Sequence, residues 1–421
     1  CADGNTEWNA RLRRRERLDT IADFVNVFND TLRECGKQAL VRLWCSGESE
    51  EWAAALPKGV PYVFKYSGFD CCDCTCDPVV KFWKDRGHEV WVSKEISGGE
   101  NAGPIVWHDP EFFHMTAEES AKAGATGIMG IDNTDHGTFG MPYAMQHANL
   151  TAYCHYTSNE EPYDEARWVD NFEKYYPGLG KAVFDALKLY ARLVLMTDKI
   201  LWGEGEGFMW YNCYNFVDVK GWPGTLGISH PVPEWVAPGI CTMNEYVHHL
   251  RFYLWGEETI SKLEAGRKSI VTLLEEATES AREGLELLKG LQDSIPIESM
   301  KEFRILLASA ALAFWTGKTW IHLVKARVEY AAVNSPGGEA SVKRGIAESC
   351  LANLDEAIAG YKRQVECLFG FPRDMMKFER IFNKDPRKQT ANGQVAHWKN
   401  ERAKVAGEFA ELLSDDVWMF P

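Results

Sequence analysis

The sequence predicts an α/β fold that comprises the C-terminal half of a (β/α)₈ TIM-type barrel followed by an α-helical bundle domain. Four short apolar runs, each leading into a loop rich in charged residues, predict strands at 38–44, 61–66, 88–96 and 126–133. Helix-like stretches lie between most of them, and alternating strands and helices imply a parallel sheet. Eight barrel strands take about 250 residues. Because only four runs precede the change in pattern, we expect an N-terminal half-barrel that is missing from this chain or supplied by another polypeptide.

The predicted helices follow from the spacing of apolar residues and from their terminators. Residues 11–36 place apolar side chains at helical spacing and end at a glycine. The apolar positions of this helix are Leu18, Ile21, Phe24, Val25, Val27 and Phe28. Further helices are expected at 49–56, 77–87, 116–123, 141–156 and 164–202.

Beyond about residue 240 the pattern becomes that of long amphipathic helices. These are expected at 256–291, 298–333, 338–368 and 395–414, with breaks at Pro296 and at 335–338. Short loops imply antiparallel neighbours, and the long helices also suggest a homodimer. The residues before them, 203–240, are rich in Gly, Trp and Pro and predict a long ordered loop that helps to build a site. Three regions follow: a barrel portion (1–160), a connecting region that completes the site (161–240) and a helical domain (241–421).

Composition narrows the classes of function. A net charge of −15 argues against a nucleic-acid-binding protein, which needs a basic surface. No run approaches the roughly 18 apolar residues of a membrane span. Of the 16 tryptophans we expect most in the core, while others are suited to stack on sugar rings. The scattered cysteines favour free thiols and a reducing, cytoplasmic compartment over an extracytoplasmic one.

Four of the 12 cysteines crowd into the motif CCDCTC, at Cys71, Cys72, Cys74 and Cys76. Tetrahedral zinc sites usually take C-x₂₋₄-C pairs from two separated elements, so this spacing strains a single site. We therefore interpret the motif as a loop beside the cleft and expect no cofactor. A metal site and a redox or disulfide role are the alternatives.

Charged residues gather where the predicted strands end. Because the carboxyl ends of parallel strands meet at one edge, they line one cleft. They are Arg42, Lys65, Asp70, Glu95, Glu100, Asp132 and Asp135. An Arg fork and a Lys suit an acidic sugar, and two carboxylates can divide acid and base work. The alternatives are a salt bridge for Arg42, a loop cap for Asp70, and a salt bridge to Lys94 or a solvated loop for Glu95 and Glu100.

Two further kinds of residue complete the predicted site. Glu7, in ADGNTEW, would lie at the mouth of a strand preceding the chain and would serve as proton donor; a frayed terminus is the alternative. Histidines expected in loops near the mouth would hydrogen-bond the substrate; these are His108, His114, His136 and His230.

At these strand ends the sequence resembles the α-glucuronidases of glycoside hydrolase family 67. VFKYSGFD matches a family pattern in which a Lys precedes an Asp by five residues, and GENAG matches a segment with a second carboxylate. VRLW matches a strand with an Arg, and GIMGIDN matches the family's GIxGxxN run. Residues 227–230 and 233–236, which include Trp235, echo a later segment.

The resemblance implies an inverting glycosidase that acts on uronic-acid-bearing oligosaccharides, without a metal. Glu7 would be the acid, and Asp70 and Glu100 would activate water. Contacts to the substrate would come from Arg42, Lys65, Glu95, Asp132, His136 and Trp235. The alternative is a non-catalytic carbohydrate-binding or assembly subunit with a degenerate barrel.

Overall fold

The structure is a computed structural model, and the chain forms two compact units. The described residues are 15–44, 50–65, 77–95, 105–131, 143–201, 270–334, 338–371 and 391–414. The first unit comprises Cys1–Ile96, Glu111–Asp132 and Ala152–Tyr163. The second comprises Ser97–Pro110, Asn133–Thr151 and Asp164–Pro421. The chain is mostly helical and holds a small parallel sheet. The predicted boundaries near 160 and 240 stay a prediction.

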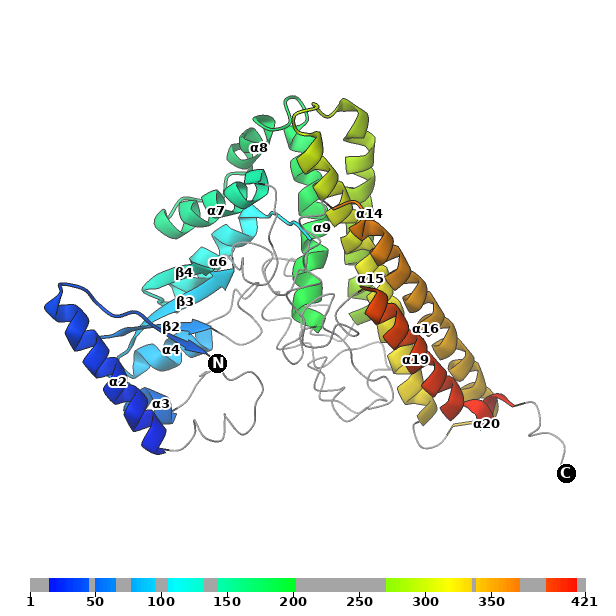
Figure 1. Ribbon diagram of the computed structural model, residues 1–421, viewed down its shortest axis with the longest axis horizontal. Helices are drawn as coiled ribbons and strands as arrows, with labels where there is room; N and C mark the ends of the chain where they lie inside the picture. Colours follow the sequence, from blue (N-terminus) through cyan, green and yellow to red (C-terminus); the bar gives the residue numbers. More distant parts are fainter. Residues whose placement is uncertain are drawn as a thin grey trace. The chain divides into compact units, whose positions relative to one another are not determined.

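The sheet of the first unit has four parallel strands in the order β1-β2-β3-β4 (Figure 1). They are β1 (Val41–Trp44), β2 (Pro61–Lys65), β3 (Glu89–Glu95) and β4 (Gly127–Ile131). Each predicted apolar run forms one of these strands, so the prediction of a parallel sheet is confirmed.

A helix precedes each strand: α2 (Arg15–Glu34), α3 (Glu50–Ala55), α4 (Asp77–Asp85) and α6 (Pro110–Ala123). Each connection from helix to strand contains a glycine with positive φ, between 66° and 87°, a conformation that favours glycine. These glycines are Gly36, Gly59, Gly87 and Gly124. The first unit therefore repeats the same helix–glycine–strand connection four times.

The core of this unit lies between the sheet and its helices. Tyr62 and Trp83 are completely buried, and the ring of His88 lies 5.6 Å and 5.1 Å from theirs. Nε2 of His88 is 2.8 Å from the carbonyl oxygen of Ala53, and burial lowers the pKa of this histidine. His88 is therefore a neutral core residue that ties α3 to the start of β3.

Helix α2 meets this core with only part of its apolar surface. Leu18, Ala22 and Val25 are buried, and Val25 belongs to the cluster that contains Leu43 and Tyr62. Ile21 is partly buried and packs against the same cluster. The remaining apolar positions predicted from the spacing, Phe24, Val27 and Phe28, are exposed.

The remaining helices begin with α7 (Tyr143–Ser158), α8 (Glu165–Glu173) and α9 (Gly180–Leu201). The helix expected over 164–202 is interrupted between α8 and α9, where Pro177 is followed by Gly178 with φ 74°. Proline lacks an N–H group and a residue with positive φ ends a helix, so the helix is interrupted here.

Long helices also form the carboxyl-terminal part of the second unit. They are α14 (Ile270–Leu291), α15 (Met300–Asn334), α16 (Ala340–Leu368), α19 (Ala391–Glu408) and the short α20 (Ala410–Leu413). The helices α9, α14, α15, α16 and α19 pack in this order, each against the next (Figure 1). None of the described helices combines the length and apolarity needed to cross a bilayer.

Small residues allow the close packing of these helices. A Cβ atom at Gly284 of α14 would lie 2.7 Å from the carbonyl oxygen of Ala186 on α9. At Gly290, in the same helix, a Cβ atom would meet nothing within 4 Å. Gly284 therefore lies where the backbone of α9 comes close to α14, while Gly290 faces open space.

Candidate functional site

Lys65 and Glu95 are the final residues of β2 and β3, two strands that pair directly. Lys65 lies opposite Trp44 at the end of β1, and Glu95 lies opposite Ile131 at the end of β4. All four strands therefore finish at one edge of the sheet, and neighbouring strands are about 4.8 Å apart. The backbone thus places a lysine and a glutamate at the carboxyl ends of two adjacent strands, and their role in a site stays a prediction.

Arg42 is placed differently from the other predicted contacts. It lies opposite Val63 in β1, two residues before the end of the strand, and its side chain is exposed. β1 is an outer strand of the sheet, next to β2 alone among the described residues. The predicted contact between this guanidinium and a sugar carboxylate stays a prediction.

Most of the predicted site lies outside the described residues. These positions are Glu7, Asp70, Glu100, Asp132, Asp135, His136, His230, Trp235, Cys71, Cys72, Cys74 and Cys76. Three of them follow the sheet closely in the chain, because Asp70 and Glu100 come five residues after Lys65 and Glu95, and Asp132 follows Ile131. Their roles stay predictions.

Two of the loop histidines predicted to contact substrate have other positions. His114 lies on α6. His108 is completely buried in the second unit, with its ring against Phe172 and Phe184. Burial lowers the pKa of His108 to about 4, so it is neutral at physiological pH. The expectation that His108 lies in a substrate-facing loop is wrong.

The segment around His108 is instead an internal part of the second unit. Val106 donates its N–H group to Oγ of Ser309 at 3.0 Å, and its carbonyl oxygen accepts the hydroxyl proton of Tyr190 at 2.5 Å. Asn149 donates from Nδ2 to the carbonyl oxygen of Trp107 at 3.0 Å. These bonds satisfy the backbone polar groups of a buried, non-helical stretch.

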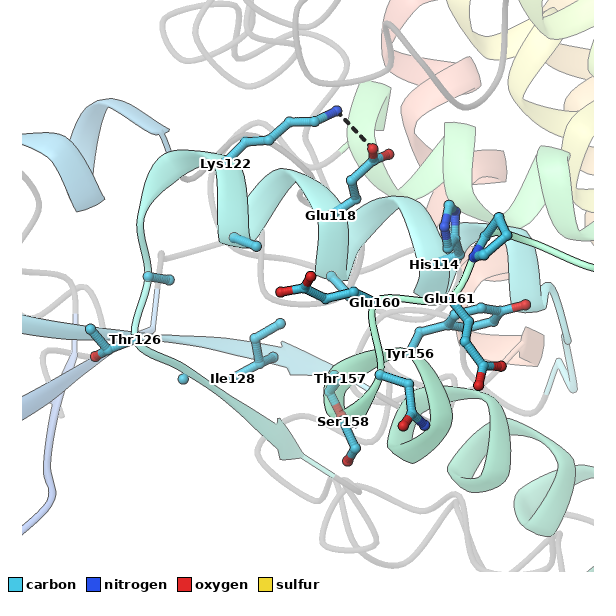
Figure 2. A pocket seen from close by; sticks show the side chains of 16 residues that line it. His114, Glu118, Lys122, Thr126, Ile128, Tyr156, Thr157, Ser158, Glu160 and Glu161 are labelled. Atoms are coloured by element: carbon cyan, nitrogen blue, oxygen red, sulfur yellow. Dashed lines mark ion pairs between the residues drawn. The ribbon is translucent and has the colours of Figure 1, made fainter.

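A pocket of about 780 Å³ lies in the first unit, between α6, the start of β4 and the end of α7 (Figure 2). No motif in the sequence indicated this pocket, because the residues that line it come from segments far apart in the chain. Nζ of Lys122 is 3.1 Å from Oε1 of Glu118, and the ring of His114 lies edge-on to Tyr156, with centroids 4.9 Å apart. Lys122 and Glu118, which both line the pocket, thus form an ion pair with each other.

The position of this pocket separates it from the predicted sugar site. Thr126 and Gly127 line it, and Gly127 is the first residue of β4. Strands rise about 3.3 Å per residue, so the carboxyl end of β4 lies more than 10 Å further along the strand. Active sites of parallel α/β folds form at the carboxyl ends of the strands. The carboxyl edge is therefore the candidate functional site.

Comparison with known proteins supports the fold. No family model matches the chain, and no curated protein matches it in sequence. Its fold is similar to that of a GH138 enzyme targeting pectin rhamnogalacturonan II, with a TM-score of 0.62 and 13% identity. The alignment covers 91% of this chain and 58% of that enzyme. The chain thus shares the fold of part of this structural neighbour and spans little more than half of its length.

Proposed function

We propose that the protein is a glycoside hydrolase acting on uronic-acid-bearing oligosaccharides. The observation that carries the proposal is the placement of Lys65 and Glu95 at the carboxyl ends of two adjacent parallel strands. A lysine beside a carboxylate at such an edge suits a substrate that has both a carboxylate and hydroxyl groups. The similarity in fold to an enzyme that targets pectin supports a pectic oligosaccharide as the substrate.

In this proposal the four described strands form half of a (β/α)₈ barrel, and the helices that follow form a bundle domain. Lys65 and Arg42 bind the sugar carboxylate, Arg42 through its guanidinium fork. Asp70 and Glu100 activate water, Glu7 protonates the leaving oxygen, and the remaining predicted contacts bind hydroxyl groups. The finer hypothesis is α-glucuronidase-like inversion, which requires the acid and the base to lie about 6.5–9.5 Å apart.

The test compares three single variants with a matched control. Asp70→Asn and Glu100→Gln should each lower kcat on pectic oligosaccharides or aryl uronides by about 10²–10⁴-fold, the usual contribution of a general base. Glu95→Gln should raise KM. Glu89→Gln is the control, since Glu89 begins the strand that Glu95 ends and accepts hydrogen bonds from Trp91 and Thr126.

Release of the product with inverted anomeric configuration, followed by proton NMR, supports the finer hypothesis. Wild-type activity in both Asp70→Asn and Glu100→Gln would contradict the assigned bases. The second candidate is a carbohydrate-binding or assembly subunit, favoured by a sheet of only four strands among the described residues. Calorimetric binding of the oligosaccharide with no hydrolysis, in a polypeptide that includes the whole barrel, would establish that candidate instead.

A further inference from the structure

Helix α2 has an apolar stripe on its surface, formed by Phe24, Val27 and Phe28. Their side chains are 68%, 67% and 47% exposed, and the two phenylalanine rings stack with centroids 6.0 Å apart. Single exposed apolar residues are common, but contiguous apolar surface marks an interface. The stripe extends over one helical turn, because Val27 and Phe28 come three and four positions after Phe24. It lies on the flank of α2 that the sheet core leaves uncovered.

The strand that follows α2 also has an open side. β1 comes first in the sheet order, and among the described residues it pairs with β2 alone. Leu40, just before β1, is 42% exposed. An outer strand offers a row of backbone N–H and C=O groups to a further strand, and soluble proteins usually cover such edges.

The order of elements indicates what covers this edge. α3, α4 and α6 each connect one strand to the next parallel strand, and each connection to the following strand contains a left-handed glycine. α2 and Gly36 form the same connection to β1. A helix that connects parallel strands crosses in a right-handed sense, so the strand preceding α2 belongs beside the free edge of β1. The helix that leads into this preceding strand then belongs beside α2.

We propose that the apolar stripe of α2 and the free edge of β1 together dock a helix–strand (αβ) unit encoded upstream of α2 in the same polypeptide. Its strand pairs in parallel with β1, and its helix covers Phe24, Val27 and Phe28. The inference rests on the half-barrel architecture of the proposed function. The length of the structural neighbour supports it, since this chain spans 58% of that enzyme.

The experiment compares the 421-residue chain with the polypeptide extended upstream by one helix–strand (αβ) unit of its gene. In the extended form, Phe24→Ser/Phe28→Ser should lower the melting temperature by roughly 5 °C or more, because it removes apolar contacts. In the 421-residue chain the same variant should leave it unchanged or raise it. Val342→Ser, at a 56% exposed position of α16, should have no effect in either form.

Hydrogen exchange gives a second measurement at the strand. The amides of Val41–Trp44 that point away from β2 should exchange at least tenfold more slowly in the extended form. Equal effects of the double variant in both forms, equal exchange, or a gene without an upstream helix–strand unit would overturn the proposal. Dimers of the 421-residue chain that Phe24→Ser/Phe28→Ser converts to monomers would assign the stripe to a second copy instead.

Glycosidase assays on the extended parent keep this inference separate from the proposed function. If the stripe and edge behave as expected but no hydrolysis occurs, the docking surface stands and the enzymatic proposal fails. If hydrolysis occurs without protection of β1, the docking surface is wrong and the enzymatic proposal stands.

Discussion

Nδ1 of His108 is hydrogen-bonded to Oδ1 of Asn149, and both side chains are completely buried. An amide oxygen only accepts, so Nδ1 carries the ring proton of His108 and Nε2 does not. No other described residue forms a hydrogen bond with this Nε2 atom. Protonation would therefore place an uncompensated cation in the core of the second unit.

This arrangement predicts acid sensitivity of the second unit. The pKa of His108 is about 4 when folded, against 6.5 for an ordinary histidine, so the unfolded chain binds more protons between these values. The free energy of unfolding should consequently fall by about 3 kcal/mol as the pH drops from 6.5 to 4, and remain constant above 6.5 on this account. Urea titrations across this range, followed by circular dichroism, measure the slope. His108→Gln should flatten it; an unchanged slope in the variant would assign the acid sensitivity to other groups.

The helix contact at Gly284 gives a second prediction. Gly284→Ala places a methyl group against the backbone of α9, and overpacking of this kind costs about 1–3 kcal/mol. Gly290→Ala, in the same helix but in open space, should instead stabilise by up to about 1 kcal/mol through helix propensity. Urea midpoints of the two variants should move in opposite directions. Shifts of the same sign would contradict the close approach of α9 and α14.

Cysteine reactivity tests the burial of the helical core. Burial raises the pKa of the Cys350 thiol to about 12, and its Sγ donates to the carbonyl oxygen of Ala326 at 3.1 Å. Cys35, in contrast, is exposed. Because the thiolate is the reactive form, iodoacetamide at pH 8 should modify Cys350 at least 10²-fold more slowly than Cys35. Peptide mapping by mass spectrometry measures both rates, and urea should bring them together. Equal rates in the native protein would contradict the packing of α15 against α16.

The role of Lys65 predicts a dependence on substrate charge. Lys65→Met should raise KM for a uronic-acid-bearing oligosaccharide about tenfold, the effect of losing one charge-assisted contact worth about 1.4 kcal/mol. KM for the carboxyl-reduced, neutral substrate should hardly change. Lys58→Met, three residues before β2 and therefore at its opposite end, is the matched control. A similar rise for both substrates would assign Lys65 to the stability of the strand rather than to binding.

Much of the first unit could be predicted from local sequence. The apolar runs act within a few residues and form strands where expected, and Gly36 ends the first helix as predicted. Helical spacing alone, however, could not show which part of the wide apolar arc of α2 faces the sheet. The burial of His108 could not be predicted from local sequence either, because Phe172 and Phe184, which pack against it, lie far from it in the chain.

The candidate site divides in the same way. Lys65 and Glu95 could be placed because parallel strands end at a common edge, a rule that needs only the strand assignments. The convergence of Asp70 and Glu100 depends on loop conformations, which no periodic pattern encodes. The pocket beside α6 carried no sequence signal, since its residues share no motif.

The left-handed glycines between helices and strands have an evolutionary consequence. Gly36, Gly59, Gly87 and Gly124 make each helix–strand pair a self-contained module with its own turn. Modules of this kind join only their neighbours, so duplication or loss of one at either border leaves the interior strand pairs intact. Such a sheet can be lengthened or shortened by whole modules over evolutionary time while the geometry of its remaining carboxyl edge persists.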